Sequence, residues 1–168
     1  MKPKLIIFSG LPGTGKSSIA EVVGTQLQIP VFAKDWLEAA LRRTGFEENT
    51  GYAGYELLTT LAERQLRLGQ SAILDSVASI TAVRQQWHTL AQTYEADWRV
   101  IECVCSDIAL HQARLAKRQR NIPDWHELAW EDVDRVRDYF AQWDEERLIL
   151  DAKRPLAENI SAALRYIQ

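Results

Sequence analysis

The sequence has few cysteines, few histidines and no long hydrophobic run, and each scarcity excludes a class of protein. The two cysteines, Cys103 and Cys105, are too few for a disulfide-held fold, so reduced thiols are expected. The three histidines are scattered and show no metal-ligand spacing. The apolar run from Leu5 to Phe8 is shorter than the ~7–15 residues of a signal-peptide core, and no stretch approaches the ~18 residues of a membrane span. We therefore expect a cytoplasmic protein without a membrane partner.

An excess of positive charge is also missing. Lys and Arg together number 20, Asp and Glu number 23, and the formal net charge is −3. A protein that covers nucleic-acid phosphates needs a basic surface, so extended nucleic-acid binding is not expected. A single nucleotide in a locally basic pocket is compatible with this balance. The hydrophobic fraction of 46% is typical of globular proteins, and 168 residues predict one domain, residues 1–168.

Short apolar segments alternate with amphipathic ones along the whole chain. The stretch 45–54 has three glycines and no periodicity, which predicts a loop. Apolar residues recur at helical spacing from about Trp130 through Phe140 to Trp143. The apolar segments that are typical of strands are residues 5–8, 31–33, 72–74, 98–104 and 148–150. This alternation predicts an α/β fold in which helices cover both faces of a parallel sheet.

The segment between the first strand and the first helix carries the most specific motif of the chain. Residues 10–17 read GLPGTGKS, which fits G-x-x-x-x-G-K-[ST] without a mismatch. Glycines let backbone N–H groups surround a phosphate, and the following helix points its N-terminus at the same anion. Lys16 is expected to reach the phosphates of ATP, and Ser17 to ligate Mg²⁺. The predicted nucleotide-binding residues of this loop are Gly10, Gly13, Thr14, Gly15, Lys16, Ser17 and Ser18.

Two carboxylates follow strands at the sheet edge where doubly wound folds bind ligands. Asp35 follows the second strand, so it is a candidate to orient or deprotonate an acceptor, or to cap a helix that begins at Trp36. Asp75 ends the third strand, where a carboxylate can reach a Mg²⁺-bound water or a substrate group. Asp35 is therefore a predicted catalytic residue, and Asp75 is a predicted metal residue.

The densest basic cluster lies in the predicted helix 107–118 and just after it. Arg114 and Arg118 are four residues apart on one helical face, and Arg118 and Arg120 lead into a polar loop. We expect these arginines to close over a triphosphate as a lid of approximately residues 114–130, with Arg114 and Arg118 catalytic and Arg118 and Arg120 nucleotide-binding. The alternative is a solvated basic face that pairs with acidic residues of the next helix.

The aromatic and imidazole side chains are expected to have mainly structural roles. Trp87 and Trp143 lie on apolar stripes and are predicted core residues. Trp125 and Trp130 either pack the lid or cover a ligand. The histidines are expected at the surface or in helix packing.

The order of these motifs resembles that of the small zeta-toxin-like P-loop kinases, whose relatives include the 5′-polynucleotide kinase domain and chloramphenicol phosphotransferase. The resemblance covers essentially the whole chain and includes GLPGTGKSS, KDW, LGQSAILDS, ECVCSD and RLAKR. It implies a P-loop NTPase fold, a three-layer α/β/α sandwich with the adenylate-kinase-like strand order 2-3-1-4-5. It also implies ATP as phosphoryl donor, Asp35 as acceptor base, Arg118 as lid arginine, and adenine near residues 151–155.

One departure from the polynucleotide kinase branch bears on the acceptor. That branch has an arginine three residues beyond the base, and this chain has Glu38 there, with Lys34 and Arg42 as the nearby cations. The sequence therefore predicts an ATP-dependent kinase that phosphorylates a hydroxyl of a small molecule, acting as a monomer or homodimer. The alternatives are a kinase for nucleic-acid 5′-hydroxyl ends and an ATP-dependent switch that needs no acceptor base.

Overall fold

A single parallel sheet organises the chain. The computed structural model describes residues 2–168, and its five strands lie in the order β2-β3-β1-β4-β5. Their bounds are β1 (Lys4–Ser9), β2 (Val31–Ala33), β3 (Ala72–Asp75), β4 (Asp97–Val104) and β5 (Leu148–Asp151). Each neighbouring pair is parallel. The predicted parallel sheet and its strand order are confirmed.

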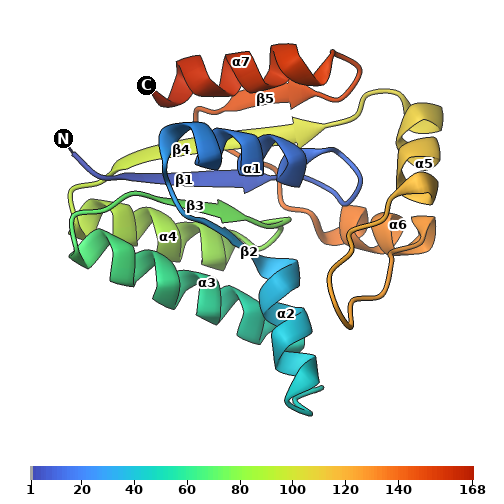
Figure 1. Cartoon of the computed structure of the whole chain (residues 1–168), viewed down its shortest axis with the longest axis horizontal. Coiled ribbons are helices and arrows are strands. Elements are labelled where there is room, and N and C mark those ends of the chain that lie inside the picture. Colours follow the sequence, from blue (N-terminus) through green and yellow to red (C-terminus); the bar gives the residue numbers. More distant parts are fainter. Residues whose placement is uncertain (1) are drawn as a thin grey trace.

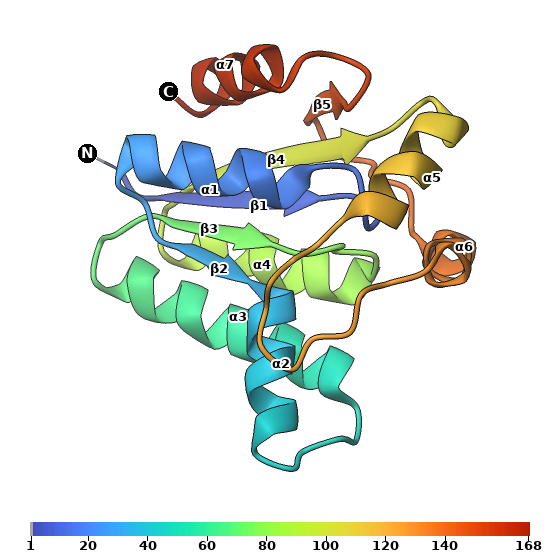
Figure 2. The same cartoon turned by 45° about the vertical axis from the view of Figure 1, so that its right-hand side comes forward.

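Helices cover both faces of this sheet and also extend beyond one end of it (Figure 1). Within residues 2–168 they are α1 (Lys16–Leu27), α2 (Lys34–Arg43), α3 (Thr50–Arg67), α4 (Thr81–Thr93), α5 (Ile108–Lys117), α6 (Trp130–Tyr139) and α7 (Leu156–Ile167). Helices α1 and α7 pack on one face, and α3 and α4 on the other. Helix α2 projects from the end of β2, while α5 and α6 lie past the carboxyl ends of the strands (Figure 2). None of the helices in residues 2–168 combines the length and apolar character that a membrane crossing requires.

The central strand β1 shows why an uninterrupted apolar run forms a strand here. Leu5 and Ile7 pack against the layer of α3 and α4, and Ile6 and Phe8 against the layer of α1 and α7. All four side chains are fully buried. Successive strand residues point to opposite faces, so a strand covered on both sides is apolar throughout. In the α3/α4 layer the predicted core residue Trp87 is fully buried.

The predicted loop 45–54 is wrong in its second half, because α3 begins at Thr50. Gly51 and Gly54 lie within the first turns of α3. At Gly54 the helix packs so closely on α2 that a larger side chain would not fit. A Cβ at Gly54 would lie 3.0 Å from the Glu38 Cγ atom and 3.2 Å from the Lys34 Cγ atom. The close packing of α3 on α2 therefore accounts for the glycine at position 54, although local helix propensity alone would favour a loop there.

The predicted helical stripe ending at Trp143 is also wrong beyond residue 139. Helix α6 ends at Tyr139, and residues 140–147 have no regular structure. Trp143 is nevertheless buried, as predicted for a core residue. The backbone carbonyls of Ala141 and Gln142 accept hydrogen bonds from a distant arginine, so these groups are satisfied without continuing the helix.

The contact between α1 and β2 provides a test of the packing that places the P-loop. A Cβ at Gly24 would lie 2.3 Å from the Val31 Cγ2 atom and 2.9 Å from the Ile29 carbonyl oxygen. Gly24→Ala should therefore lower the free energy of unfolding by about 1–3 kcal/mol, because the added methyl forces α1 from β2. Urea denaturation measures this change.

Gly51→Ala is the matched control, since Gly51 is also helical. Its Cβ would meet only ordinary contacts, the nearest being Glu38 Oε1 at 3.6 Å, and alanine favours a helix by roughly 0.5–1 kcal/mol. Gly51→Ala should therefore leave stability unchanged or slightly increased. Equal losses in the two variants would contradict the packing argument.

Candidate active site

The loop between β1 and α1 is shaped as an anion cradle. Gly13 and Gly15 both have a φ of 84°, a left-handed conformation that favours glycine. At Gly10 a Cβ would lie 2.2 Å from the Cys103 carbonyl oxygen, so no side chain fits there. Gly15 is the N-cap of α1 and forms no side-chain cap hydrogen bond. The first N–H groups of α1 are thus available for a phosphate.

Lys16 and Asp75 are both buried beneath this cradle, near enough for their charges to interact. Lys16 is 6% exposed and Asp75 is 4% exposed. Burial lowers the pKa of Lys16, and the negative charge of Asp75 opposes that shift. Burial likewise raises the pKa of Asp75, opposed by Lys16 and the Ser17 hydroxyl. Two opposite charges stabilise each other here, and a bound phosphate would add a further partner for Lys16.

The oxygen atoms at this position fit a nucleotide-bound Mg²⁺ ion. Asp75 Oδ1 and Ser76 Oγ are buried without a hydrogen-bond partner, and buried polar atoms rarely lack one unless a ligand supplies it. No group of three His, Cys, Asp or Glu residues in the described part of the chain could hold a metal. Mg²⁺ typically takes one or two protein oxygens and completes its shell with phosphates and water. Ser17 and Asp75 fit that role.

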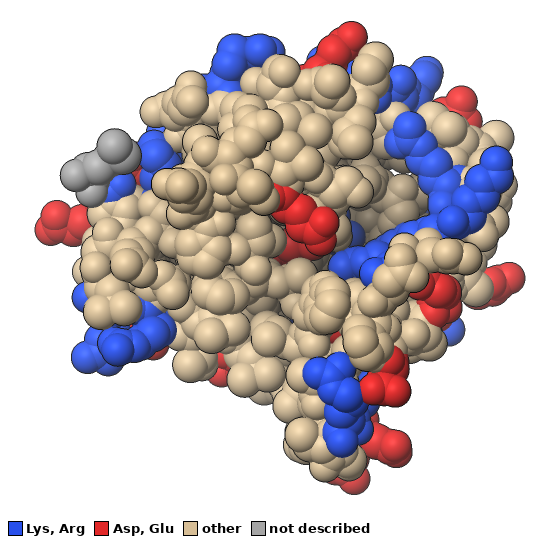
Figure 3. Space-filling model, in the orientation of Figure 1, with Lys and Arg blue, Asp and Glu red and all other residues tan. Residues whose placement is uncertain are grey.

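A cavity of about 460 Å³ opens above the cradle. Its wall combines the P-loop with arginines from the end of α5, and Figure 3 shows Lys and Arg side chains gathered beside a hollow on this face. The predicted site residues that line it are Gly13, Gly15, Lys16, Ser17, Ser18, Arg114, Arg118 and Arg120. Gly10 and Thr14 instead line a separate cavity of about 390 Å³, and the Thr14 hydroxyl donates to the Leu11 carbonyl.

Asp35 is not the helix cap that the sequence analysis gave as its alternative role. Helix α2 begins at Lys34 with Ala33 as its N-cap, so Asp35 lies in the first helical turn and caps nothing. Its carboxylate accepts a hydrogen bond from Arg120 Nη1 at 2.6 Å and lies 3.7 Å from Arg118 Nη2. The arginines expected to bind phosphate are thus held by the carboxylate expected to bind the acceptor.

The connection between α5 and α6, residues 118–129, is the lid loop, and it rests on α2 (Figure 2). Arg42 Nη1 lies 2.8 Å from His126 Nδ1, and its guanidinium carbon lies 5.2 Å from the centre of the Trp125 ring. Arg43 donates to the Pro123 carbonyl at 3.3 Å. These contacts and the ion pairs of Asp35, rather than ion pairs with acids of the next helix, hold the loop. Arg118 Nη1 is buried there without a hydrogen-bond partner, so an anion in the cavity could bind it.

Glu38 is buried and forms an ion pair with Lys34. Lys34 Nζ also lies 4.5 Å from the centre of the Tyr55 ring. Both cations considered as substitutes for the missing arginine therefore have other partners, since Arg42 contacts the lid loop. The position three residues beyond Asp35 is thus held by a buried, ion-paired glutamate.

His111 is a residue that the sequence analysis did not place at the site. It is buried on α5, and its Nε2 atom lies 2.7 Å from the Pro12 carbonyl oxygen of the P-loop. Trp130 packs edge-on against its ring with 5.1 Å between the centroids. Burial lowers the pKa of His111, so the neutral ring is the dominant form near neutral pH. No local signal reveals this contact, because 99 residues separate the two partners.

Comparisons with known proteins bear on the family and the fold. A family model described as an AAA domain matches residues 5–143. No curated protein matches the sequence.

Three solved structures share the fold. A suggested kinase from Chloroflexus aurantiacus J-10-fl has 20% sequence identity, a TM-score of 0.77 and coverage of 100% of both chains. A sugar kinase from Janibacter sp. HTCC2649 has 17% identity, a TM-score of 0.73 and coverage of 98% of this chain and 94% of that one. The APS kinase of Mycobacterium tuberculosis with AMPPNP and APS has 17% identity, a TM-score of 0.64 and coverage of 99% and 98%. The fold is that of the P-loop NTPase kinases.

The contact between Asp35 and the two lid arginines predicts competition with a nucleotide. A phosphate that binds Arg118 and Arg120 must displace the Asp35 carboxylate. Asp35→Asn should therefore tighten binding of the non-hydrolysable analogue AMPPNP with Mg²⁺ by about fivefold, the worth of one partly buried ion pair. Isothermal titration calorimetry measures this affinity.

Glu127→Gln is the matched control for the loss of one negative charge. The Glu127 carboxylate accepts from the backbone N–H of Arg120, not from its guanidinium. Its substitution should change the affinity by less than about twofold. If Asp35→Asn binds no more tightly than Glu127→Gln, Asp35 does not compete with the phosphate.

Proposed function

The chain belongs to the AAA domain family of P-loop proteins, and on that premise we propose that it is an ATP-dependent kinase. It transfers the γ-phosphoryl group of ATP to a hydroxyl of a small molecule. The observation that carries the proposal is the approach of a carboxylate, Asp35, to within 3.7 Å of a lid arginine, Arg118, beside the P-loop. A kinase needs both groups at one point, one for the acceptor and one for the migrating phosphoryl group.

In this proposal each residue has a separate task. The N–H groups of the P-loop and Lys16 hold the phosphates of ATP. Ser17 and Asp75 would hold Mg²⁺, which neutralises phosphate charge when bound. Asp35 orients the acceptor hydroxyl and accepts its proton. Arg118 stabilises the charge of the phosphoryl group during its transfer. Arg114 and Arg120 line the same cavity.

The acceptor is proposed to be small and to lack a phosphate at the α2 side. Glu38 occupies the place of an arginine that would bind such a phosphate, and it is neutralised by Lys34. The formal net charge of −3 gives little support to a nucleic-acid 5′ end as acceptor. A cytoplasmic location, which suits the free thiols Cys103 and Cys105, and a monomeric or homodimeric single domain stay part of the proposal.

Nucleotide binding is tested with Lys16. ATP with Mg²⁺ should raise the melting temperature of the wild type through mass action. Lys16→Ala should abolish most of that increase, because the ammonium is a phosphate ligand. The variant should remain folded without nucleotide, because burial raises the pKa of Asp75 and this carboxylate can take up a proton when the Lys16 charge is lost. Differential scanning fluorimetry compares the two proteins. An undiminished ATP effect in Lys16→Ala would contradict the assignment.

Phosphoryl transfer is tested with Asp35. ADP release is first screened across sugars, nucleosides, antibiotics and oligonucleotides to find an acceptor. With that acceptor, Asp35→Asn should reduce transfer by roughly 10²–10⁴-fold, the usual contribution of a general base. Hydrolysis of ATP without an acceptor should change much less, because water needs no such base to react slowly. Transfer at nearly the wild-type rate would favour an ATP-dependent switch over a kinase.

A further inference from the structure

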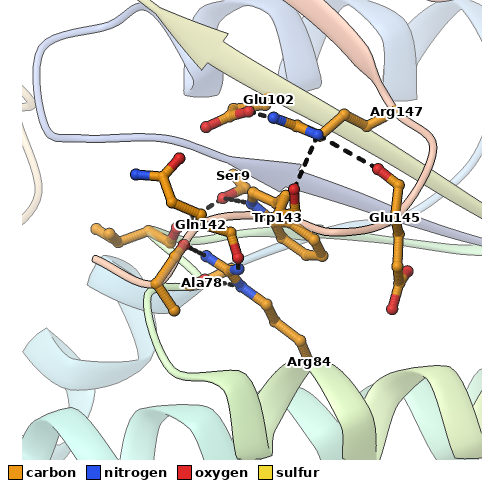
Figure 4. Close-up of polar contacts among 10 residues, drawn as sticks. Ser9, Ala78, Arg84, Glu102, Gln142, Trp143, Glu145 and Arg147 are labelled. Atoms are coloured by element: carbon orange, nitrogen blue, oxygen red, sulfur yellow. Dashed lines mark hydrogen bonds and ion pairs between the residues drawn. The ribbon is translucent and has the colours of Figure 1, made fainter. Parts of the chain in front are cut away.

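Arg84 of α4 is a buried cation that binds three backbone carbonyls (Figure 4). Its Nε atom donates to the Ala78 oxygen at 2.6 Å, Nη1 to the Gln142 oxygen at 2.9 Å and Nη2 to the Ala141 oxygen at 2.7 Å. The side chain thus joins the turn after β3 to the irregular segment 140–147. Arg84 is only 4% exposed, so this junction lies inside the molecule.

The guanidinium is also held between aromatic rings. Its central carbon lies 3.8 Å from the centre of the Trp143 ring and 5.2 Å from that of Phe140. A planar, delocalised cation suits such stacking, and a lysine ammonium does not. None of its hydrogen bonds goes to a carboxylate, and burial lowers its pKa. Transferring a positive charge from water to a site with only carbonyl partners is unfavourable in free energy. Stabilisation of the fold alone is therefore a weak explanation for Arg84.

The contacts continue from Arg84 to the start of the P-loop. Trp143 Nε1 donates to the Ser9 hydroxyl at 3.0 Å, and that hydroxyl donates to the Val77 carbonyl at 2.8 Å. The backbone N–H of Gly10 reaches the same carbonyl at 3.3 Å. The residues that follow Asp75 are therefore tied to the first residues of the phosphate cradle.

The turn that follows Asp75 needs such support. Ala78 has a φ of 51°, a left-handed conformation that is unfavourable for a residue with a Cβ. The Arg84 Nε–H bonds the carbonyl of this same residue. Without that bond the turn could relax, and the relaxation would be transmitted along three residues to Asp75, whose Oδ1 atom lacks a partner.

We propose that Arg84 is a positioning residue that holds Asp75 at the Mg²⁺ position next to Ser17. It acts through the turn 76–78 and does not touch the nucleotide. The inference rests on the proposed function, because it concerns the residues that would hold the metal. It assigns to α4, on the side of the sheet away from the nucleotide, an influence on how strongly Mg²⁺ enhances nucleotide binding.

Arg147 is a matched control on the same segment. It donates to the Trp143 and Glu145 carbonyls and to the Glu102 carboxylate at 2.5 Å, as Figure 4 shows. It therefore stabilises residues 140–147 from the other side, yet none of its hydrogen bonds reaches the turn 76–78. A general loosening of the segment should affect Arg147→Met as much as Arg84→Met.

The experiment measures AMPPNP affinity by calorimetry with and without Mg²⁺, and the ratio of the two is the readout. Arg84→Met should reduce this ratio by about tenfold, as is usual when a group that orients a metal ligand is lost. Its affinity without Mg²⁺ should fall less than its affinity with Mg²⁺, because Gly10 keeps its own bond to the Val77 carbonyl. Arg147→Met should keep the ratio. Arg84→Lys, which retains the charge without the planar fork, should behave like Arg84→Met.

A double-mutant cycle with Asp75→Asn tests the route. Asp75→Asn should itself lower the ratio, and adding Arg84→Met should lower it no further, because both act at one point. A preserved ratio in Arg84→Met would overturn the inference, as would equal losses in Arg147→Met. If Arg84→Met does not fold, the affinity ratio of Arg84→Lys tests the inference instead. If Mg²⁺ does not change the AMPPNP affinity of the wild type, the metal part of the proposed function is refuted. That result is distinguishable from failure of the Arg84 inference, because it appears without any substitution.

Discussion

The parallel pairing of β1, β2 and β3 at their carboxyl ends is the constraint on which the site depends. Phe8 of β1 and Ala33 of β2 both pair with Asp75 of β3. The P-loop, the first turn of α2 and Asp75 therefore leave the sheet at the same level. Because strands in such a sheet lie about 5 Å apart, three chemically different groups converge without any of them being near another in sequence.

This convergence places several charges close together in a largely buried region, and their balance determines which ion pairs the site forms. Lys16 compensates Asp75, and the lid arginines compensate Asp35. In the proposed function, Asp35 would thereby occupy the partners that a phosphate would bind. The same carboxylate that would orient an acceptor also holds the lid loop on α2, so the proposed nucleotide and acceptor sites would be electrostatically linked.

Arginine hydrogen bonds to backbone carbonyls replace regular structure around the site. Residues 140–147 form neither a helix nor a strand, yet their carbonyls are bound by Arg84 and Arg147. Backbone carbonyls that an irregular segment turns away from water need such partners. The result is a hydrogen-bonded support beneath the P-loop, with Trp143 bonded to Ser9 at the point where β1 ends.

The sequence by itself determined the strands, their alternation with helices and the P-loop, because each is encoded within a few consecutive residues. Strand order came from the family resemblance that these motifs support. The sequence also selected Asp35, Asp75 and the arginines as candidates, but not how they meet. The helical start of α3 and the end of α6 were predicted wrongly, since packing against α2 and hydrogen bonds from Arg84 override local periodicity there. Only the tertiary structure joined Asp35 to Arg120 across 85 residues and His111 to Pro12 across 99. Such contacts depend on how the strands are ordered in space, and no short-range pattern records that order.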